Sequence, residues 1–159
     1  MKRSAKTGIV RLWLILLFAG LSMITVSAVS SAVTIGQNYG GGIVFDVDKT
    51  GQHGLIASRS DMAGHSEDYP EGYFTWGDAK SECYALNENG YTDWYLPNKS
   101  ELNKLYLKRN VVGGFLVDTY WSSTPSRTDI AWLQAFRDGS QWDHGKPGYA
   151  YRVRAIRPF

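Results

Sequence analysis

Histidine and acidic side chains gather between residues 58 and 74, and these are residue types that can do chemistry. The group consists of Asp61, His65, Glu67, Asp68 and Glu71. Imidazole and carboxylate groups bind metals, but the spacing here matches no known zinc or calcium ligand set. The stretch lacks helical or strand periodicity and contains Pro70, which is typical of a long surface loop. We therefore favour a solvated acidic loop and predict no metal site.

Cys83 is the single cysteine of the chain, so an exported form has no internal disulfide. Residues 75–87 carry helical spacing. The apolar face of this predicted helix contains Trp76, Ala79, Cys83 and Leu86. A reactive thiol needs a partly exposed, electropositive setting, whereas Cys83 belongs to the apolar face. We predict that Cys83 is a buried structural residue.

Three consecutive glycines, Gly40 to Gly42, are the nearest approach to a phosphate-binding loop. A strand pattern follows them at residues 43–47, where a P-loop would continue with Lys-Ser/Thr and a helix. No Ser/His/Asp arrangement or paired-carboxylate motif stands out elsewhere. The sequence thus presents no catalytic constellation, and we predict a protein that is not an enzyme.

Residues 90–102 join two predicted helices through a short connection that contains proline. Gly90 suits the C-terminal end of the first helix, where a residue with positive φ is needed. Pro97 prevents helix at the residue before it. Asn98, with Glu101 three residues later, has the pattern of a capping box. A second helix is therefore predicted from Asn98 to about residue 110.

The other regular patterns are those of strands. In chain order they cover residues 43–47, 53–57, 94–96, 120–124, 130–136 and 151–157. Asp138-Gly139 is a hairpin-turn signal, and the polar residues 140–149 are predicted to form a loop. This order predicts an α+β domain, with two helices packed on antiparallel sheets and long loops. We also expect the first and last strands to pair and close the domain.

The N-terminus has the composition of a secretory signal. Four basic residues precede an apolar stretch that starts at Leu12, and small residues offer cleavage sites up to Ala32. We predict a signal peptide over residues 1–32 and a single domain over residues 33–159. An uncleaved anchor is the alternative, because no charge occurs from Leu12 to Phe45. Such an anchor would be the one link of the protein to a membrane.

Removal of residues 1–32 changes the charge of the chain. It takes away four of 17 Lys and Arg and none of the 15 Asp and Glu, so the net charge moves from +2 to about −2. The basic balance therefore belongs to the export segment, and nothing in it favours a nucleic-acid partner. We predict an exported protein, located in the periplasm, on the outer surface or in the medium.

A set of short motifs extends over almost the whole mature chain. They are Tyr39-Gly40-Gly41-Gly42-Ile43-Val44-Phe45, His53-Gly54-Leu55-Ile56-Ala57, Trp76 with Ala79 and Cys83, Gly90-Tyr91-Thr92-Asp93-Trp94-Tyr95-Leu96-Pro97, Tyr120-Trp121-Ser122-Ser123-Thr124, Ala131-Trp132, and Arg152-Val153-Arg154-Ala155-Ile156-Arg157. In order and spacing they resemble the Lcl C-terminal domain family. One departure is Tyr95, where family members usually have arginine. The resemblance implies a C-type-lectin-like fold and an exported or surface-bound bacterial module.

The chemistries known for this type of fold are not matched by the sequence. A calcium-dependent lectin would need Glu-Pro-Asn or Gln-Pro-Asp, whereas Leu96-Pro97-Asn98 lacks the acidic ligand. A formylglycine-generating oxidase would need a cysteine pair for copper, whereas Cys83 is alone. The namesake adhesin carries a collagen-like region, and this chain has no Gly-X-Y repeat. We therefore expect no cofactor.

The resemblance places the ligand site on the loop-rich face formed by the late segments. Tyrosine and tryptophan give rigid contact area, and arginine or lysine can meet sulfate or carboxylate groups. The candidate ligand-binding residues are Trp142, Asp143, His144, Lys146, Tyr149, Tyr151, Arg127 and Arg137. Trp121 and Trp132 lie in predicted strands and are assigned to the core. For Trp142, a core role and a binding role are equally open.

These expectations favour an exported, non-enzymatic binding module that resembles an adhesin and recognises a glycan or a cell-surface protein. Two alternatives remain open. One is a structural or assembly subunit of the bacterial envelope or a fimbria, joined through an edge strand that contains Arg152 and Arg154. The other is a receptor-binding protein diversified in its late loops. The sequence leaves the oligomeric state open.

Overall fold

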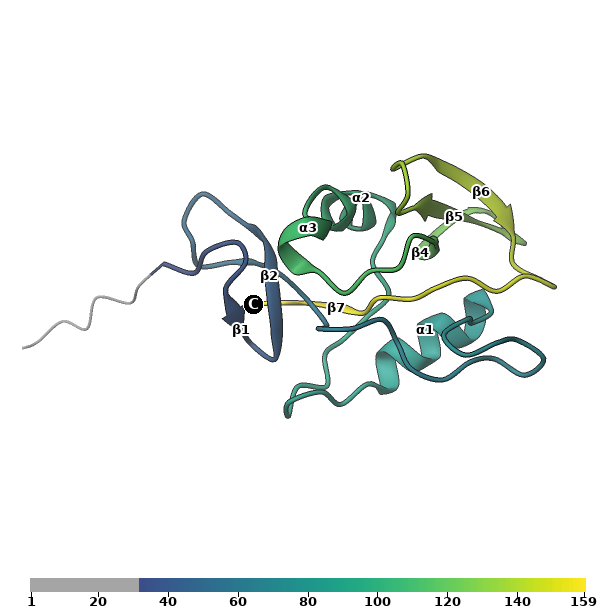
Figure 1. Cartoon of the computed structure of the whole chain (residues 1–159), viewed down its shortest axis with the longest axis horizontal. Coiled ribbons are helices and arrows are strands. Elements are labelled where there is room, and N and C mark those ends of the chain that lie inside the picture. Colours follow the sequence, from purple (N-terminus) through teal and green to yellow (C-terminus); the bar gives the residue numbers. More distant parts are fainter. Residues whose placement is uncertain (1–31) are drawn as a thin grey trace, which may run out of the picture. The chain divides into compact units, whose positions relative to one another are not determined.

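The computed structural model describes residues 32–159, so the predicted signal segment lies outside the described residues except for Ala32. The helices and strands are β1 (Asn38–Tyr39), β2 (Gly42–Val47), β3 (Gly54–Ala57), α1 (Trp76–Ala85), α2 (Lys99–Leu107), α3 (Arg109–Val112), β4 (Thr119–Arg127), β5 (Ile130–Ala135), β6 (Gln141–Gly145) and β7 (Ile156–Pro158). The strands form two antiparallel sheets, ordered β1-β2-β3-β7 and β4-β5-β6 (Figure 1). This arrangement confirms the predicted α+β class.

The two helices begin where the local sequence rules place them. Thr75 caps α1 by accepting a hydrogen bond from the backbone N–H of Asp78. Asn98 accepts from the N–H of Glu101 at 2.9 Å, and the Glu101 carboxylate accepts from the N–H of Asn98 at 2.8 Å. This reciprocal pair is the predicted capping box, which satisfies two N–H groups that the first turn of α2 leaves free.

Gly90 has the predicted positive φ, but it does not end a helix. α1 already ends at Ala85. Asn89 and Gly90 have φ values of 54° and 82°, and Glu88 and Tyr91 exchange two backbone hydrogen bonds around them. Two central residues with positive φ define the tightest hairpin turn, for which Asn-Gly is the preferred pair. The sequence signal was therefore that of a turn and not of a helix end.

The strands differ from the prediction in several places, and residues 94–96 are the first, because only Tyr95 pairs there, in an isolated bridge with Ile156. β4 continues through Pro125 to Arg127, and residues 141–145, predicted as loop, form β6. Of the predicted strand 151–157, only the end belongs to a ladder, as β7. β7 pairs with β3, with Leu55 opposite Pro158, so the last strand does not pair with the first. The hairpin of β2 and β3 is confirmed.

Neighbouring strand residues point into two separate hydrophobic clusters. Val44 and Trp121 belong to the cluster that contains the buried residues of α1, whereas Phe45 and Tyr120 belong to the cluster that contains those of α2. The central strands therefore bury both faces, as strands covered on two sides do. α1 and α2 lie on opposite sides of the layer that the strands form (Figure 1).

Candidate functional site

The end of β6 and the turn after it carry an aromatic cluster. The His144 ring meets the Tyr149 ring edge-on, with centroids 4.1 Å apart, and the Tyr151 ring at 6.0 Å. Tyr151 in turn packs edge-on against Trp121 at 4.9 Å. The series runs from a fully buried tryptophan to Tyr149, whose side chain is 48% exposed. The core thus holds a chain of rings whose last member faces solvent.

Lys146 joins this cluster to the start of α1. Its ammonium group lies 3.9 Å from the centroid of the Trp76 ring and donates to the carbonyl of Thr128 at 2.9 Å. Lys80 approaches the same ring at 4.5 Å. A cation held over an aromatic ring keeps its charge available to an acidic ligand. We use the name sheet-end cluster for Trp76, His144, Lys146, Tyr149 and Tyr151.

Tyr151 is the residue of the sheet-end cluster whose pKa is clearly shifted by its surroundings. Burial raises the pKa of its phenol, and the neighbouring Tyr149 acts in the same direction. The Nδ1 atom of His144 is buried and has no hydrogen-bond partner among the described residues. Both rings are therefore held mainly by packing, which fixes the surface on which Tyr149 rests.

Trp142 and Arg137 lie apart from the sheet-end cluster. They line a shallow pocket of about 290 Å³ together with Asp118 and Ser140. Asp118 accepts hydrogen bonds from the phenol of Tyr73 and from Nε of Arg152, the latter at 3.3 Å. Trp142 is 36% exposed. Trp142 on β6 therefore borders a polar pocket that is separate from the aromatic rings at the other end of this strand.

Asp143 lies apart from both groups, and the backbone carbonyl of Arg127 meets the sheet-end cluster at Lys146. Asp143 accepts a hydrogen bond from the hydroxyl of Ser126 and stands opposite Trp132 on β5. Arg127 ends β4 with an exposed side chain. Because residues alternate along a strand, Asp143 points to the other face of the sheet from Trp142 and His144. The eight predicted residues are thus divided among three places.

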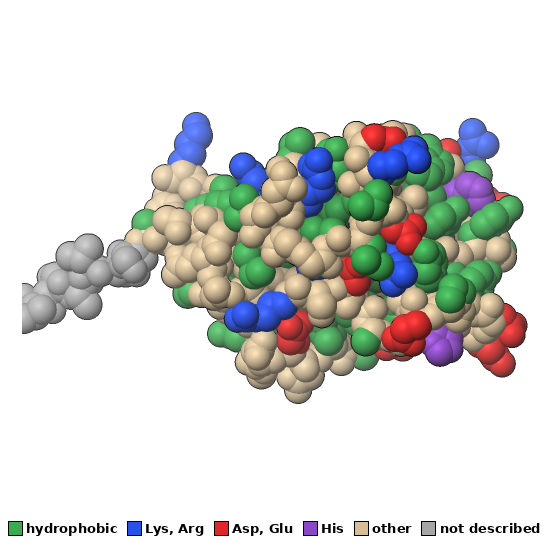
Figure 2. Space-filling view, in the orientation of Figure 1, with side chains coloured by type: hydrophobic (Ala, Val, Ile, Leu, Met, Phe, Trp, Pro, Cys, Tyr) green, Lys and Arg blue, Asp and Glu red, His purple; other side chains and the backbone are tan. Residues whose placement is uncertain are grey.

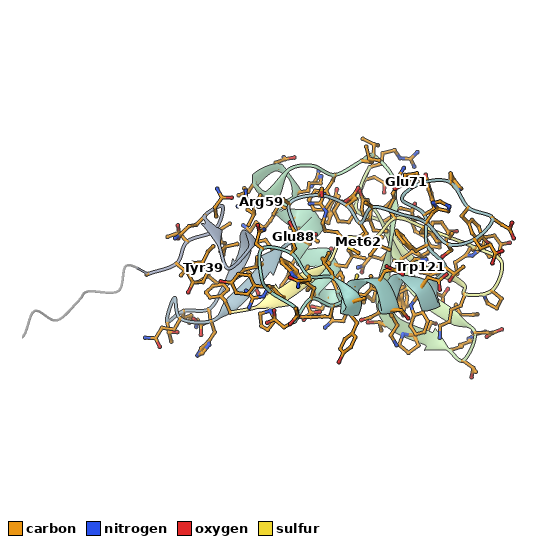
Figure 3. All side chains as sticks on the ribbon, turned by 90° about the horizontal axis from the view of Figure 1, so that it is seen from below. Tyr39, Arg59, Met62, Glu71, Glu88 and Trp121 are labelled. Carbon is orange, nitrogen blue, oxygen red and sulfur yellow. The ribbon has the colours of Figure 1, made fainter. Side chains whose placement is uncertain are left out.

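Trp132 is not a core residue, contrary to the prediction. Its side chain is only partly buried, and the ammonium group of Lys99 lies 2.9 Å from its ring centroid. It shares the outer face of the sheet with Asp143. Trp121 is fully buried, as predicted, and its indole N–H donates to the carbonyl of Phe74 at 2.8 Å. In Figure 3 it lies in the interior beside α1.

The acidic loop uses its side chains to fix its own shape. Glu71 accepts from the N–H of Gly64 and pairs with His65 at 3.2 Å, and these contacts lower the pKa of its carboxyl. Asp78, at the start of α1, accepts from the hydroxyls of Ser66 and Thr75, which lowers its pKa as well. Within residues 32–159, no group of three His, Cys, Asp or Glu side chains is arranged to hold a metal ion.

The late arginines each form an ion pair with one aspartate. Arg152 pairs with Asp118, Arg154 with Asp61 and Arg157 with Asp93. The Arg154 side chain is fully buried, and β7 is covered at Ile156 by two backbone hydrogen bonds with Tyr95. Of the two arrangements left open for the strand with Arg152 and Arg154, an exposed edge and a closed sheet, the structure therefore does not support the exposed edge.

Cys83 is buried, as predicted, and burial raises the pKa of its thiol to about 12, with Glu82 acting in the same direction. We expect the folded protein to react with a disulfide reagent at pH 8 roughly a thousandfold more slowly than an exposed thiol, because the thiolate fraction is that much smaller. The measurement is the colour released by the native protein and by the protein in urea. Rapid reaction of the native protein would contradict this assignment, and no other cysteine can supply the signal.

Trp76 and Lys80 are the site residues that sequence reasoning missed. Trp76 was assigned to the apolar face of α1, but it is the first helical residue and only partly buried. The spacing of four between Trp76 and Lys80 is the signal that could have found the pair, because such residues are neighbours on a helix surface. The approach of Lys146 from β6 had no signal in the sequence.

Every helix within the described residues 32–159 is too short or too polar to cross a bilayer. A comparison with curated proteins found no match. The sequence model of the Lcl C-terminal domain matches residues 49–157. This range begins before β3 and ends within β7, so it includes the three helices, the three late arginines and the sheet-end cluster. The chain belongs to the Lcl C-terminal domain family.

Proposed function

We propose that this protein is an exported, non-enzymatic binding module that recognises a glycan or another cell-surface ligand through the sheet-end cluster. Export is supported by the basic start and apolar stretch of residues 1–32. A C-type-lectin-like fold is part of the proposal, supported by two helices beside two antiparallel sheets and a long ordered loop between β3 and α1. We propose no cofactor.

The exposure of Tyr149 on a packed ring cluster is the observation that carries the proposal. Sugar rings stack on aromatic side chains that are held rigidly, since little conformational freedom is then lost on binding. Tyr149 is supported from below by His144 at 4.1 Å, and His144 touches Tyr151. The ring of Tyr149 is thus presented in one orientation, with a phenol group that can hydrogen-bond to a hydroxyl.

The charges around Tyr149 give the ligand a preferred chemistry. Lys146 and Lys80 share the Trp76 ring, and Arg127 ends β4 in the same region, where the carbonyl of this residue faces Lys146 at 3.5 Å. Cations beside an aromatic platform suit a sugar that carries a carboxylate or another acidic group. The acidic net charge of the mature chain limits long-range attraction to such ligands.

An assembly role is the second candidate, and the open edge of β6 supports it. Ala135 donates to Ser140 and Lys146 donates to Asp129 across the β5–β6 pair. Because hydrogen-bonded pairs alternate along antiparallel strands, the backbone groups of Gln141, Asp143 and Gly145 point away from β5. An extended segment of another protein can pair with such an edge. The edge strand available for assembly is therefore β6 and not the last strand.

The test is a glycan array that includes neutral, carboxylated and sulfated chains, probed with residues 33–159. This part contains every residue of both core clusters. Tyr149→Ala and Trp142→Ala form a matched pair, since both side chains are aromatic and exposed, at 48% and 36%. We expect Tyr149→Ala to lose about 1–3 kcal/mol of binding free energy by removing one stacking platform, and Trp142→Ala to bind normally.

Other outcomes of these binding tests would move the site or contradict the proposal. Loss of binding in Trp142→Ala alone would move the site to the pocket that this residue shares with Arg137. If no glycan is bound, and envelope proteins are captured by the wild-type domain but not by a variant with Asp143→Pro, the β6 edge is the functional surface, because proline removes the edge N–H. If neither glycan nor envelope protein is bound, the proposal fails.

A further inference from the structure

Exposed aliphatic side chains are concentrated in one short segment of the domain. Leu107 is 65% exposed, Val111 and Leu116 are each 49% exposed, and Val117 is 78% exposed. These residues cover the last turn of α2, α3 and the loop before β4. Single exposed apolar residues are normal on a protein surface, but several within one short segment indicate a contact site. We call these four residues, together with Ile35, the α3 patch.

Ile35 brings the beginning of the domain to the same place. It is 42% exposed, and a methyl group placed on the next residue, Gly36, would lie 2.9 Å from the Val111 side chain. The chain therefore reaches the domain alongside α3. Ile35 thus belongs to the same exposed aliphatic surface as Val111.

The charges within the segment are positive up to Val117, and Asp118, which follows it, is paired with Arg152. From residue 102 to residue 117 the sequence contains Lys104, Lys108 and Arg109 and no acidic residue. Lys104 pairs with Asp46, but Lys108 and Arg109 form no salt bridge within the described residues 32–159. In Figure 2, Lys and Arg side chains stand beside hydrophobic ones over the helices α2 and α3.

We propose that the α3 patch rests on an anionic lipid bilayer. Exposed aliphatic residues bordered by lysine and arginine match the boundary between acyl chains and acidic headgroups. A second copy of this chain fits the patch less well, because two-fold pairing would bring the same unpaired cations face to face without an acidic partner. The inference concerns a surface distinct from the sheet-end cluster and does not depend on its ligand.

The position of the patch agrees with a surface-bound binding module. α3 lies near β1 and β2 at one end of the described unit, and β6 leads to the other end (Figure 1). Val117 of the patch shares a pocket with Trp142 near the start of β6. A domain that rests on a bilayer through α3 would therefore have the other end of β6, which leads to the sheet-end cluster, farther from the lipid. The two surfaces can act at the same time.

The test is co-sedimentation of residues 33–159 with vesicles of phosphatidylcholine mixed with phosphatidylglycerol, and with phosphatidylcholine alone. We expect binding to the anionic vesicles that weakens as salt is added. The double variant Leu107→Gln with Val117→Gln should weaken it about tenfold or more, because two inserted aliphatic groups are lost. Tyr84→Gln is the matched control, since Tyr84 is 80% exposed on α1, away from the patch, and it should bind as the wild type does.

A second variant separates charge from insertion. Lys108→Gln should weaken binding to anionic vesicles about fivefold and leave any binding to neutral vesicles unchanged. The proposal is overturned if the wild-type domain does not sediment with anionic vesicles, or if Tyr84→Gln weakens binding as much as the double variant. It is also overturned if light scattering shows a dimer that the double variant abolishes, because a second copy would then occupy the patch.

Discussion

Asp61→Ala should lower the free energy of unfolding by about 3–5 kcal/mol, the usual cost of leaving a buried charge without its partner. Arg154 donates from Nε to Asp61 at 2.8 Å, and its side chain is fully buried. The remaining guanidinium N–H groups donate to the carbonyls of Ser58, Gly113 and Gly114. Those carbonyls satisfy hydrogen bonds but carry no negative charge, so they cannot replace the carboxylate.

The measurement is urea denaturation of residues 33–159, and Asp93→Ala is the matched control. Asp93 also pairs with a late arginine, Arg157, but its side chain is 50% exposed. The Arg157 side chain is only 10% exposed, but it also donates to the carbonyl of Gly40 at 2.9 Å, and removal of the half-exposed Asp93 side chain opens it to water. The control should therefore cost less than Asp61→Ala. Equal losses in the two variants would show that the burial of Arg154 does not set the cost of breaking its pair.

The stabilisation that the Asp93–Arg157 pair provides should decrease as the pH falls. The hydrogen bond and charge of Arg157 hold the pKa of Asp93 below its ordinary value. A carboxyl whose pKa is depressed on folding stabilises the protein above its unfolded pKa, and the stabilisation is lost as the pH falls through the folded value. The difference between wild type and Asp93→Ala should therefore disappear in acid.

Local sequence rules predicted the parts of this fold that depend on neighbouring residues. The capping box of Asn98 and Glu101 needs only a spacing of three, and the structure contains it as predicted. The hairpin of β2 and β3 follows from two apolar runs around a polar turn. The burial of Cys83 follows from its place on the apolar face of α1. In each case the determining residues lie within one turn or one hairpin.

The parts that could not be predicted depend on residues far apart in the chain. Arg154 meets partners 93 and 96 positions away, so nothing near it indicates that an arginine in an alternating strand pattern will be buried. β6 is the edge strand of its sheet and has Trp142 as its one large apolar residue, so it pairs with β5 without hydrophobic alternation in its own sequence. Periodicity cannot identify such a strand.

The candidate site could be predicted only in part, because the ends of strands determine which of its side chains meet. The sheet-end residues His144, Lys146, Tyr149 and Tyr151 come together because β6 ends at Gly145. The chain then returns to pair with Phe74 at Tyr151 and with Tyr120 of β4 at Arg152. Trp142 and Asp143 precede that turn, so strand alternation separates them onto two faces. Residue types indicated which side chains could bind, and only the strand boundary at Gly145 determines which of them meet.

Trp121→Ala should cost about 3–5 kcal/mol of unfolding free energy, because it empties the space of one of the two buried tryptophans in the first core cluster. Trp121 is fully buried, its indole donates to the carbonyl of Phe74 at 2.8 Å, and its ring supports Tyr151 at 4.9 Å. Trp121→Phe keeps most of the volume and loses the hydrogen bond, so it should cost about 1–3 kcal/mol. Both values are measured by urea denaturation of residues 33–159.

The same substitution tests whether the core holds the sheet-end cluster in place. Trp121→Ala removes the ring against which Tyr151 packs. Tyr151 in turn contacts His144, and His144 contacts Tyr149. Under conditions where the variant stays folded, we therefore expect ligand binding to weaken with Trp121→Ala and to be retained with Trp121→Phe, whose ring can still support Tyr151. Trp142→Ala, at an exposed tryptophan on β6, should cost about 1 kcal/mol or less. A variant that is destabilised by the expected amount and yet binds normally would show that Tyr149 does not need the rings beneath it.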